Sequence, residues 1–179
     1  IMNLDEETGI SIMKIVEDLD SGPVSNTYKI KINRNQNAQE ISEKLSYLAA
    51  EKVLDDIDNI LEDNAKFINQ DHSKATYAKK IDKKEGLIDW NMEAVKILGK
   101  INGLIPIPGA YFNFNGERYK ILKAEIGTGK GEVGEVLSDK LEIVCGKNQS
   151  LKILEIQRQG KKPQKINEFM LGSQIKKGS

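Results

Sequence analysis

The sequence predicts an α+β protein that ends in a small, OB-like β-barrel. Three observations lead to this fold class: a long helical spacing in residues 41–61, two short strand-like runs before it, and five short strand-like runs in residues 110–156. Short strands at regular spacing, separated by turn residues, are typical of a closed or partly open barrel, of which the oligonucleotide-binding (OB) type is one member.

The first two strand-like runs lie near the start of the chain. Apolar residues predict a strand in residues 10–16, turn chemistry follows in residues 17–23, and an alternating run covers residues 28–32. An isolated two-stranded hairpin is marginal in water and leaves its edges unpaired. We therefore expect the chain to be truncated and this pair to belong to a larger sheet.

One long amphipathic helix follows the strands. Asn37 and Glu40 have the spacing of a capping box, which marks a helix start. Apolar residues then recur every three or four positions, as they do on one face of a helix. These residues are Ile41, Leu45, Leu48, Leu54, Ile57 and Leu61.

The helix is followed by a linker. Residues 63–73 are polar, and residues 75–90 mix lysines, acids and isolated apolar side chains without a lasting period. We therefore divide the chain into a first part of residues 1–70, a linker of residues 71–90 and a carboxyl-terminal domain of residues 91–179.

The carboxyl-terminal domain opens with helical spacing and continues with strands. Residues 94–104 predict a helix that Pro106 and Pro108 end. The strand-like runs are residues 110–114, 119–126, 134–137, 141–145 and 151–156. A short helix in residues 165–171 closes the domain.

The composition is that of a globular chain, with 39% hydrophobic and 30% charged residues. No apolar run approaches the ~18 residues that cross a bilayer, and no signal peptide pattern is present, so we expect a cytoplasmic protein without membrane contact. Residues 1–90 hold 12 Lys/Arg against 18 Asp/Glu, and residues 91–179 hold 15 against 9. The basic half suits a phosphate backbone, although a solvated lysine surface explains it equally well.

Several conspicuous residues have ordinary explanations. Cys145 lies in an apolar alternation and predicts a buried thiol. His72 stands in a polar segment without partners at metal or triad spacing, so no metal is expected. The glycines of residues 127–134 lack the spacing of a phosphate-binding loop and predict a hairpin loop. Trp90 fits either packing between domains or base stacking, and its place between linker and helix favours packing.

Residues 7–23 carry the first family resemblance. The stretch Leu19-Asp20-Ser21-Gly22-Pro23 behind a strand resembles the end of the catalytic domain of folate-dependent formyltransferases. The resemblance implies that residues 1–70 are the tail of an α/β, Rossmann-like formyltransferase domain. It also implies that Asp20 is a catalytic carboxylate, which would position water or accept a proton as the formyl group reaches an amine. Taken alone, an Asp in a turn is a solvated turn former.

A longer series extends the resemblance over the whole chain. Residues 75–81, 84–90 and 105–112 look like the linker and the start of the carboxyl-terminal domain of methionyl-tRNA formyltransferases, and residues 154–163 and 169–172 resemble their closing pattern. One departure is Ile107, which stands where the family has tryptophan and suits plain packing.

The resemblance implies a reaction and its partners. The formyl donor would be 10-formyltetrahydrofolate, and the acceptor would be the methionyl amino group of initiator tRNA. Basic residues would hold the tRNA backbone. They are Lys79, Lys80, Lys83, Lys84, Arg158, Lys161 and Lys162. The family's Asn-x-His-x-Ser motif and most of the folate pocket would precede Ile1, so we expect this chain alone to be inactive. No stable protein partner is evident.

Two alternatives remain open. The chain could be a non-catalytic module that binds tRNA through a basic barrel, or it could derive from a sugar-nucleotide formyltransferase, whose carboxyl-terminal domains are similar. The segment of residues 157–163 and the basic tail favour the tRNA enzyme.

Overall fold

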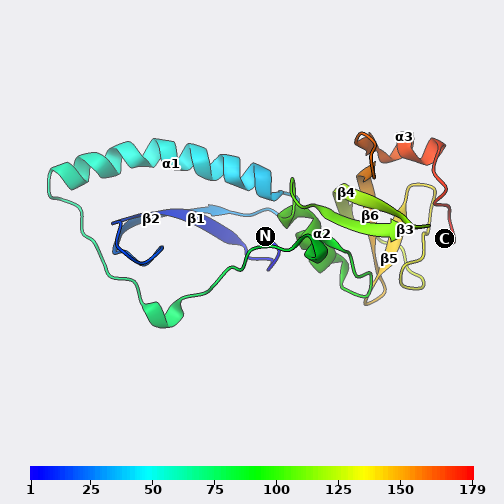
Figure 1. The fold of residues 1–179 in the computed structure, drawn as a ribbon, viewed down its shortest axis with the longest axis horizontal. Helices are drawn as coiled ribbons and strands as arrows, with labels where there is room; N and C mark the ends of the chain where they lie inside the picture. Colours follow the sequence, from blue (N-terminus) through cyan, green and yellow to red (C-terminus); the bar gives the residue numbers. More distant parts are fainter. The chain divides into compact units, whose positions relative to one another are not determined.

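A computed structural model describes all 179 residues, and its internal contacts divide the chain into two compact units. The first, here called the carboxyl unit, comprises residues 1–5, 33–39 and 81–179. The second, here called the hairpin–helix unit, comprises residues 6–32 and 40–80. Both units combine helical segments with antiparallel strands, which confirms the α+β class (Figure 1).

The hairpin–helix unit consists of two strands and a long helix. Strand β1 (Glu7–Met13) pairs antiparallel with β2 (Val24–Lys31), and α1 (Ala38–Leu61) runs alongside them (Figure 1). The helix begins directly after Asn37, where the capping-box spacing predicts its start. The side-chain amide of Asn26 on β2 donates to the buried carboxylate of Asp56 on α1, so this pair fixes the helix against the strand. A short 3₁₀ turn, η1 (His72–Lys74), follows.

The carboxyl unit is built on a curled antiparallel sheet. Its strands are β3 (Ala110–Phe114), β4 (Glu117–Ile126), β5 (Glu142–Cys145), β6 (Gln149–Arg158) and β7 (Gln164–Lys165). They pair in the order β3-β4-β6-β5, with β7 also on β6. The helical segments of the unit are η2 (Lys83–Gly86), α2 (Ala94–Gly103) and α3 (Ile166–Leu171).

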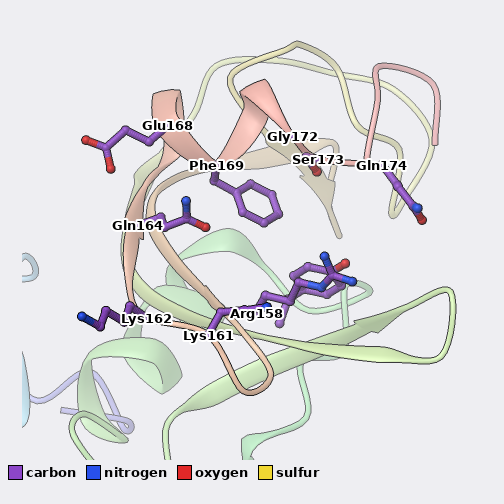
Figure 2. Close-up of a pocket in the computed structure, with 10 residues that line it drawn as sticks. Arg158, Lys161, Lys162, Gln164, Glu168, Phe169, Gly172, Ser173 and Gln174 are labelled. Carbon is purple, nitrogen blue, oxygen red and sulfur yellow. The ribbon is translucent and has the colours of Figure 1, made fainter.

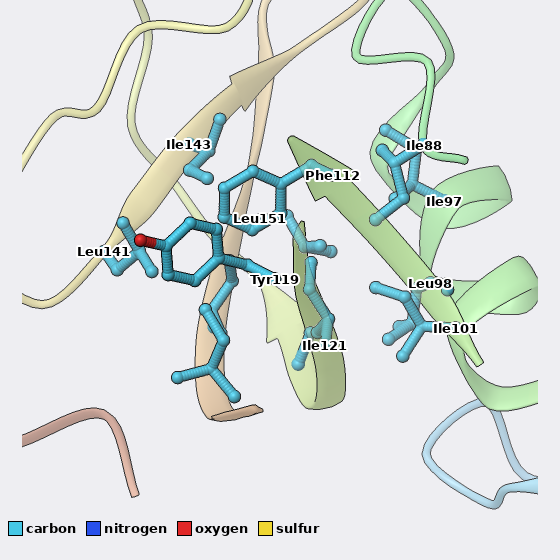
Figure 3. Packing of buried hydrophobic residues seen from close by; sticks show 14 of the residues in the cluster. Ile88, Ile97, Leu98, Ile101, Phe112, Tyr119, Ile121, Leu141, Ile143 and Leu151 are labelled. Carbon is cyan, nitrogen blue, oxygen red and sulfur yellow. The ribbon is translucent and has the colours of Figure 1, made fainter. Parts of the chain in front are cut away.

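The hydrophobic core lies between the sheet and α2 (Figure 3). Ile97 and Ile101 of α2 are almost fully buried, and they belong to the same cluster as Ile121 and Leu151 of the sheet. The positions match the sequence patterns, because apolar residues recur at helical spacing in α2 and alternate in β4 up to the irregular register between Ile121 and Ala124. The side-chain oxygen of Gln149 accepts from the amide of Ala94 at 2.9 Å, which satisfies a free donor at the start of α2.

Residues 134–137 do not form the regular strand that the sequence predicts. Gly134 has a positive φ of 89°, and the segment contacts β5 through one isolated bridge, between Val136 and Ile143, and through a few separate backbone hydrogen bonds that do not form a regular ladder. The amide of Val136 donates to the carbonyl of Ser179 instead of extending a ladder. The two-residue strand β7 was not predicted, because two residues carry no periodic signal.

Three single residues can be compared with their predictions. Cys145 is fully buried, as predicted. Trp90 packs against the core of the carboxyl unit, with its ring 5.8 Å from that of Phe112, so it is a packing residue. The prediction of plain packing for Ile107 is wrong, because this side chain is 81% exposed in the turn between Pro106 and Pro108. No helix in the structure has the length and apolar character needed to span a bilayer.

Candidate functional site

The carboxyl unit contains a cleft of about 350 Å³ beside α3, here called the α3 cleft (Figure 2). Its walls come from the ends of β4 and β6, the turn after β6, β7, α3 and the segment behind α3. The lining residues are Tyr119, Arg158, Lys161, Lys162, Gln164, Glu168, Phe169, Gly172, Ser173 and Gln174. Three of the basic residues predicted to bind nucleic acid, Arg158, Lys161 and Lys162, therefore lie together.

Backbone pairing places these three cations. Arg158 stands directly opposite Tyr119 in the register of β6 and β4. The amide of Lys161 donates to the carbonyl of Arg158 at 3.0 Å, and the Gln157 side chain donates to the carbonyl of Lys161 at 2.8 Å. Gly160 has a φ of 72°, which glycine adopts without strain, so the turn that carries the lysines is well defined.

Glu117 organises the wall of the cleft that carries Arg158. One carboxylate oxygen accepts from the guanidinium of Arg158 at 2.5 Å, and the other accepts from the hydroxyl of Tyr119 at 2.9 Å. The hydrogen bond from Arg158, followed by that from Tyr119, holds the pKa of Glu117 below its usual value. Burial, followed by the bond to Glu117, raises the pKa of Tyr119. The network thus keeps Arg158 charged and oriented.

Aromatic rings connect the cleft to the core. The Tyr119 ring packs edge-on to Phe169 of α3, with centroids 5.8 Å apart, and stacks on Phe112 at 5.5 Å. Both cleft aromatics are nearly buried, whereas the side chain of Arg158 is 42% exposed. The surface that the cleft offers to a ligand is therefore mainly the guanidinium and the polar groups around it.

The four linker lysines are all exposed, and none forms an ion pair. Lys83 and Lys84 belong to η2 in the carboxyl unit, where Asp82 and Glu85 form a reciprocal capping box. Lys79 and Lys80 belong to the hairpin–helix unit. Exposure leaves all four ammonium groups available to an anionic partner.

Asp20 lies in the loop between β1 and β2. It is exposed and has a left-handed φ of 54°. The Gln70 side chain donates to the carbonyls of Asp20 and Gly22 at 2.8 and 2.7 Å, which fixes the loop backbone. The carboxylate of Asp20 has no hydrogen-bond partner, so it faces solvent as an unpaired charge. Gln70 was not recognised in the sequence, because 50 residues separate it from Asp20.

A second cavity, of about 610 Å³, is lined by residues of β4, β6 and the start of α3. Its lysines face carboxylates across the strands: Lys123 is opposite Glu155, and Lys152 is opposite Glu125. Opposite charges at paired positions stabilise a sheet surface. The α3 cleft is therefore the stronger candidate for an anionic ligand.

Sequence reasoning missed most of the uncharged lining of the cleft. Gln164, Ser173 and Gln174 come from short segments without a motif, and Phe169 was identified only as part of the closing family pattern. Glu117 was missed because its partner Arg158 lies 41 residues further along the chain. No group of three or more His, Cys, Asp or Glu side chains has the arrangement of a metal site.

Comparisons with known proteins identify a matching family and similar relatives. The family described as "Formyl transferase, C-terminal domain" matches residues 80–174. The chain is 64% identical, over all of its 179 residues, to the methionyl-tRNA formyltransferase of Pelagibacter ubique, and it spans 58% of that relative's length. The residues of the α3 cleft and of η2 all lie within the stretch, residues 80–174, that the family matches.

Two solved structures show the same fold at low sequence identity. One is HypX from Aquifex aeolicus, in a complex with tetrahydrofolic acid, with a TM-score of 0.71 and 19% identity, covering 98% of this chain and 32% of HypX. The other is WlaRD, a sugar 3N-formyl transferase, with a TM-score of 0.70 and 17% identity, covering 90% of this chain and 58% of WlaRD.

Proposed function

We propose a function from one premise: this chain belongs to the formyl transferase family, whose C-terminal domain it contains, and it shares 64% of its residues with a methionyl-tRNA formyltransferase. The proposed reaction is transfer of a formyl group from 10-formyltetrahydrofolate to the methionyl amino group of initiator tRNA. The observation that carries the proposal is the 64% identity to a methionyl-tRNA formyltransferase over the whole chain.

The proposed division of labour follows the chain. Residues 1–70 belong to the catalytic domain, residues 71–90 form the linker, and residues 91–179 form an OB-like domain that grips the tRNA. The curled five-stranded sheet supports the OB-like assignment, because such barrels bind oligonucleotides.

The tRNA backbone would be held by the three cations of the α3 cleft and the four linker lysines. Their exposure and their freedom from ion pairs support this role, except for Arg158, which Glu117 orients. Every nucleotide carries a phosphate whatever its base. Contacts of these cations with phosphates would therefore position the tRNA and would not select its bases. The acceptor is an aminoacyl-tRNA, so we assign the protein to the cytoplasm.

Asp20 would act at the reacting amine. An exposed carboxylate on a backbone fixed by Gln70 can accept a proton as the amine attacks the formyl carbon. The folate itself would bring the formyl group.

The tRNA-binding part of the proposal can be tested by titration across salt concentrations. The 179-residue chain is mixed with initiator tRNA in a filter-binding assay between 50 and 300 mM KCl. We expect the logarithm of the affinity to fall linearly with the logarithm of salt concentration. Replacing both Lys161 and Lys162 with Gln is expected to lower the slope by about 1.5, at about 0.7 to 0.9 per lost phosphate contact.

A matched control removes the same charge elsewhere. Lys96 and Lys130 are exposed and lie outside both cavities, so the double replacement with Gln should leave the slope nearly unchanged. Equal slopes for the wild type and the Lys161/Lys162 variant would remove these lysines from the interface. An affinity that does not vary with salt would contradict phosphate binding altogether.

A second candidate is formylation of a sugar nucleotide. The fold similarity to WlaRD over 90% of this chain favours it. The two candidates differ in the amine that is formylated. A longer version of the protein that includes the upstream region of its relatives would be offered methionyl-tRNA and a dTDP-amino sugar in parallel, and formylation of the sugar alone would establish the second candidate.

A further inference from the structure

The α3 cleft has the size of one nucleotide and is too small for a helix. Its volume, about 350 Å³, lies at the lower end of the range for small-ligand sites. The walls converge from β6, β7 and α3 around a single hollow (Figure 2). A paired base within a duplex cannot enter such a hollow, whereas a base that is already unpaired can do so without unstacking a helix.

One wall offers a plane on which a base can stack. The guanidinium of Arg158 lies beside the Tyr119 ring and is fixed by its bond to Glu117. Unpaired bases stack on aromatic rings and on guanidinium planes, and a plane held in place loses little entropy on binding. Because Tyr119 and Phe169 are nearly buried, Arg158 provides most of the exposed plane.

Polar side chains elsewhere in the cleft offer hydrogen bonds to a base edge. Gln164 extends from β7, and Ser173 and Gln174 follow α3 (Figure 2). Amide and hydroxyl side chains provide both donors and acceptors, which is what the Watson–Crick edge of a base requires. Gln164 is half-buried and Gln174 is exposed, so the side-chain amides of both can meet a ligand in the cleft.

Lys161 and Lys162 complete the arrangement at the rim. Both are exposed, and the turn that carries them is closed by the bond from the Lys161 amide to the Arg158 carbonyl. A phosphate attached to a nucleotide in the cleft would lie near these ammonium groups. Glu168 also lines the cleft, and its charge opposes a second phosphate there.

We propose that the α3 cleft takes up one unpaired nucleotide of the RNA, with the base against Arg158, its edge at Gln164, and its phosphate at Lys161 and Lys162. This inference rests on the proposed function, because it assumes that RNA is the ligand. It goes further by assigning to the carboxyl unit a preference for an unpaired nucleotide over a paired one.

The test compares two RNA duplexes of equal length with the full 179-residue chain. One is blunt, and the other ends in a single 3′ overhanging 2-aminopurine. We expect the overhang to increase the affinity about five- to a hundred-fold, which is the range for stacking of one base. The fluorescence of the 2-aminopurine should fall as it stacks in the cleft.

Two variants locate the effect. Arg158→Lys keeps the charge but removes the plane, and it should reduce the preference for the overhang to less than about two-fold while blunt-duplex binding persists. Gln164→Ala should reduce the preference without touching the Glu117 network, which keeps the test valid if Arg158→Lys disturbs folding. Arg118→Lys is the matched control, because Arg118 lies over the Tyr111 ring and outside the cleft.

The outcomes separate the inference from the proposed function. Equal affinity of the wild type for both duplexes overturns the cleft inference and leaves RNA binding intact. A preference for the overhang that survives both cleft variants also overturns it. Absence of binding to either RNA overturns both proposals. Binding of free AMP that depends on Arg158, without RNA binding, overturns the RNA assignment and identifies a site for a free nucleotide.

Discussion

Glu117 joins two side chains of the α3 cleft through one carboxylate. Its folded-state pKa lies below the ordinary value because Arg158, followed by Tyr119, donates to the charged form. A lowered pKa means that this carboxylate favours the folded state above the unfolded pKa of about 4.3, and that the contribution is lost as the pH falls through the folded value. The cleft is therefore fully assembled at neutral pH.

The lowered pKa of Glu117 should be directly measurable by NMR. A ¹³C NMR titration of the Glu117 carboxyl should give a midpoint below the ordinary glutamate value of about 4.3. Replacing Arg158 with Met should raise the Glu117 midpoint, because the largest cause of the lowering is removed. A Glu117 midpoint at the ordinary glutamate value in the wild type would show that the network does not form in solution.

Cys145 illustrates the opposite effect of burial on a titrating group. Burial raises the pKa of its thiol to about 11, so at pH 8 very little thiolate is present. We expect native protein to react with iodoacetamide at least about a hundred-fold more slowly than the same protein in guanidinium chloride. Rapid labelling of the native protein at pH 8 would mean that β5 opens readily.

At the scale of elements, the loop between β4 and β5 depends on one carboxylate. Glu142 accepts from the hydroxyl of Ser150 at 2.7 Å and from the amides of Gly129 and Thr128 at 2.8 and 3.1 Å. Burial raises the pKa of Glu142, but these three bonds outweigh it and the net pKa is lowered. The predicted hairpin loop of glycines is thus held in place by a side chain of the following strand.

Removal of this carboxylate should loosen the loop. We expect Glu142→Ala to reduce the free energy of unfolding by about 1 to 3 kcal/mol, because the three donors lose a charged acceptor. The neighbouring Glu125→Ala, at an exposed position, should change it by less than about 0.5 kcal/mol. Urea denaturation of both variants measures the difference, and equal stabilities would argue against an anchoring role.

The long elements could be predicted from the sequence, and the site only in part. The borders of α1, α2 and β3 follow from helical or alternating spacing within single segments. The cleft depends on partners from distant segments, such as Glu117 with Arg158, and no local pattern reports such a pair. The cations were recognised because charge is visible in the sequence, whereas Gln164 and Gln174 have a meaning only once the fold places them.

The helical period of α1 also shows what a pattern leaves open. Spacing alone indicates an apolar face on residues 41–61, and the structure leaves much of that face in solvent: Leu54 is 66% exposed and Leu61 is 79% exposed. Periodicity predicts the face of a helix without saying what covers it. Helix formation and burial are therefore separate questions here.

At the scale of the whole molecule, burial is distributed unevenly. Every fully buried apolar side chain except Ile41 belongs to the carboxyl unit. Stability in proteins follows buried apolar contacts, and regions with few of them open at lower free energy than the core. The hairpin–helix unit is accordingly expected to be the less stable part of this chain.

Hydrogen exchange tests this expectation in the intact 179-residue chain. Amides of β4 and β6, which are central in the sheet and line the core, should have protection factors at least about ten-fold higher than those of β1, β2 and α1, equivalent to a difference of about 1.4 kcal/mol in opening free energy. Asp56→Ala, which removes the buried partner of Asn26, should lower protection in α1 further and leave β6 unchanged. Uniform protection across both units would contradict the prediction, because it would require the sparsely packed helix and hairpin to open only together with the core.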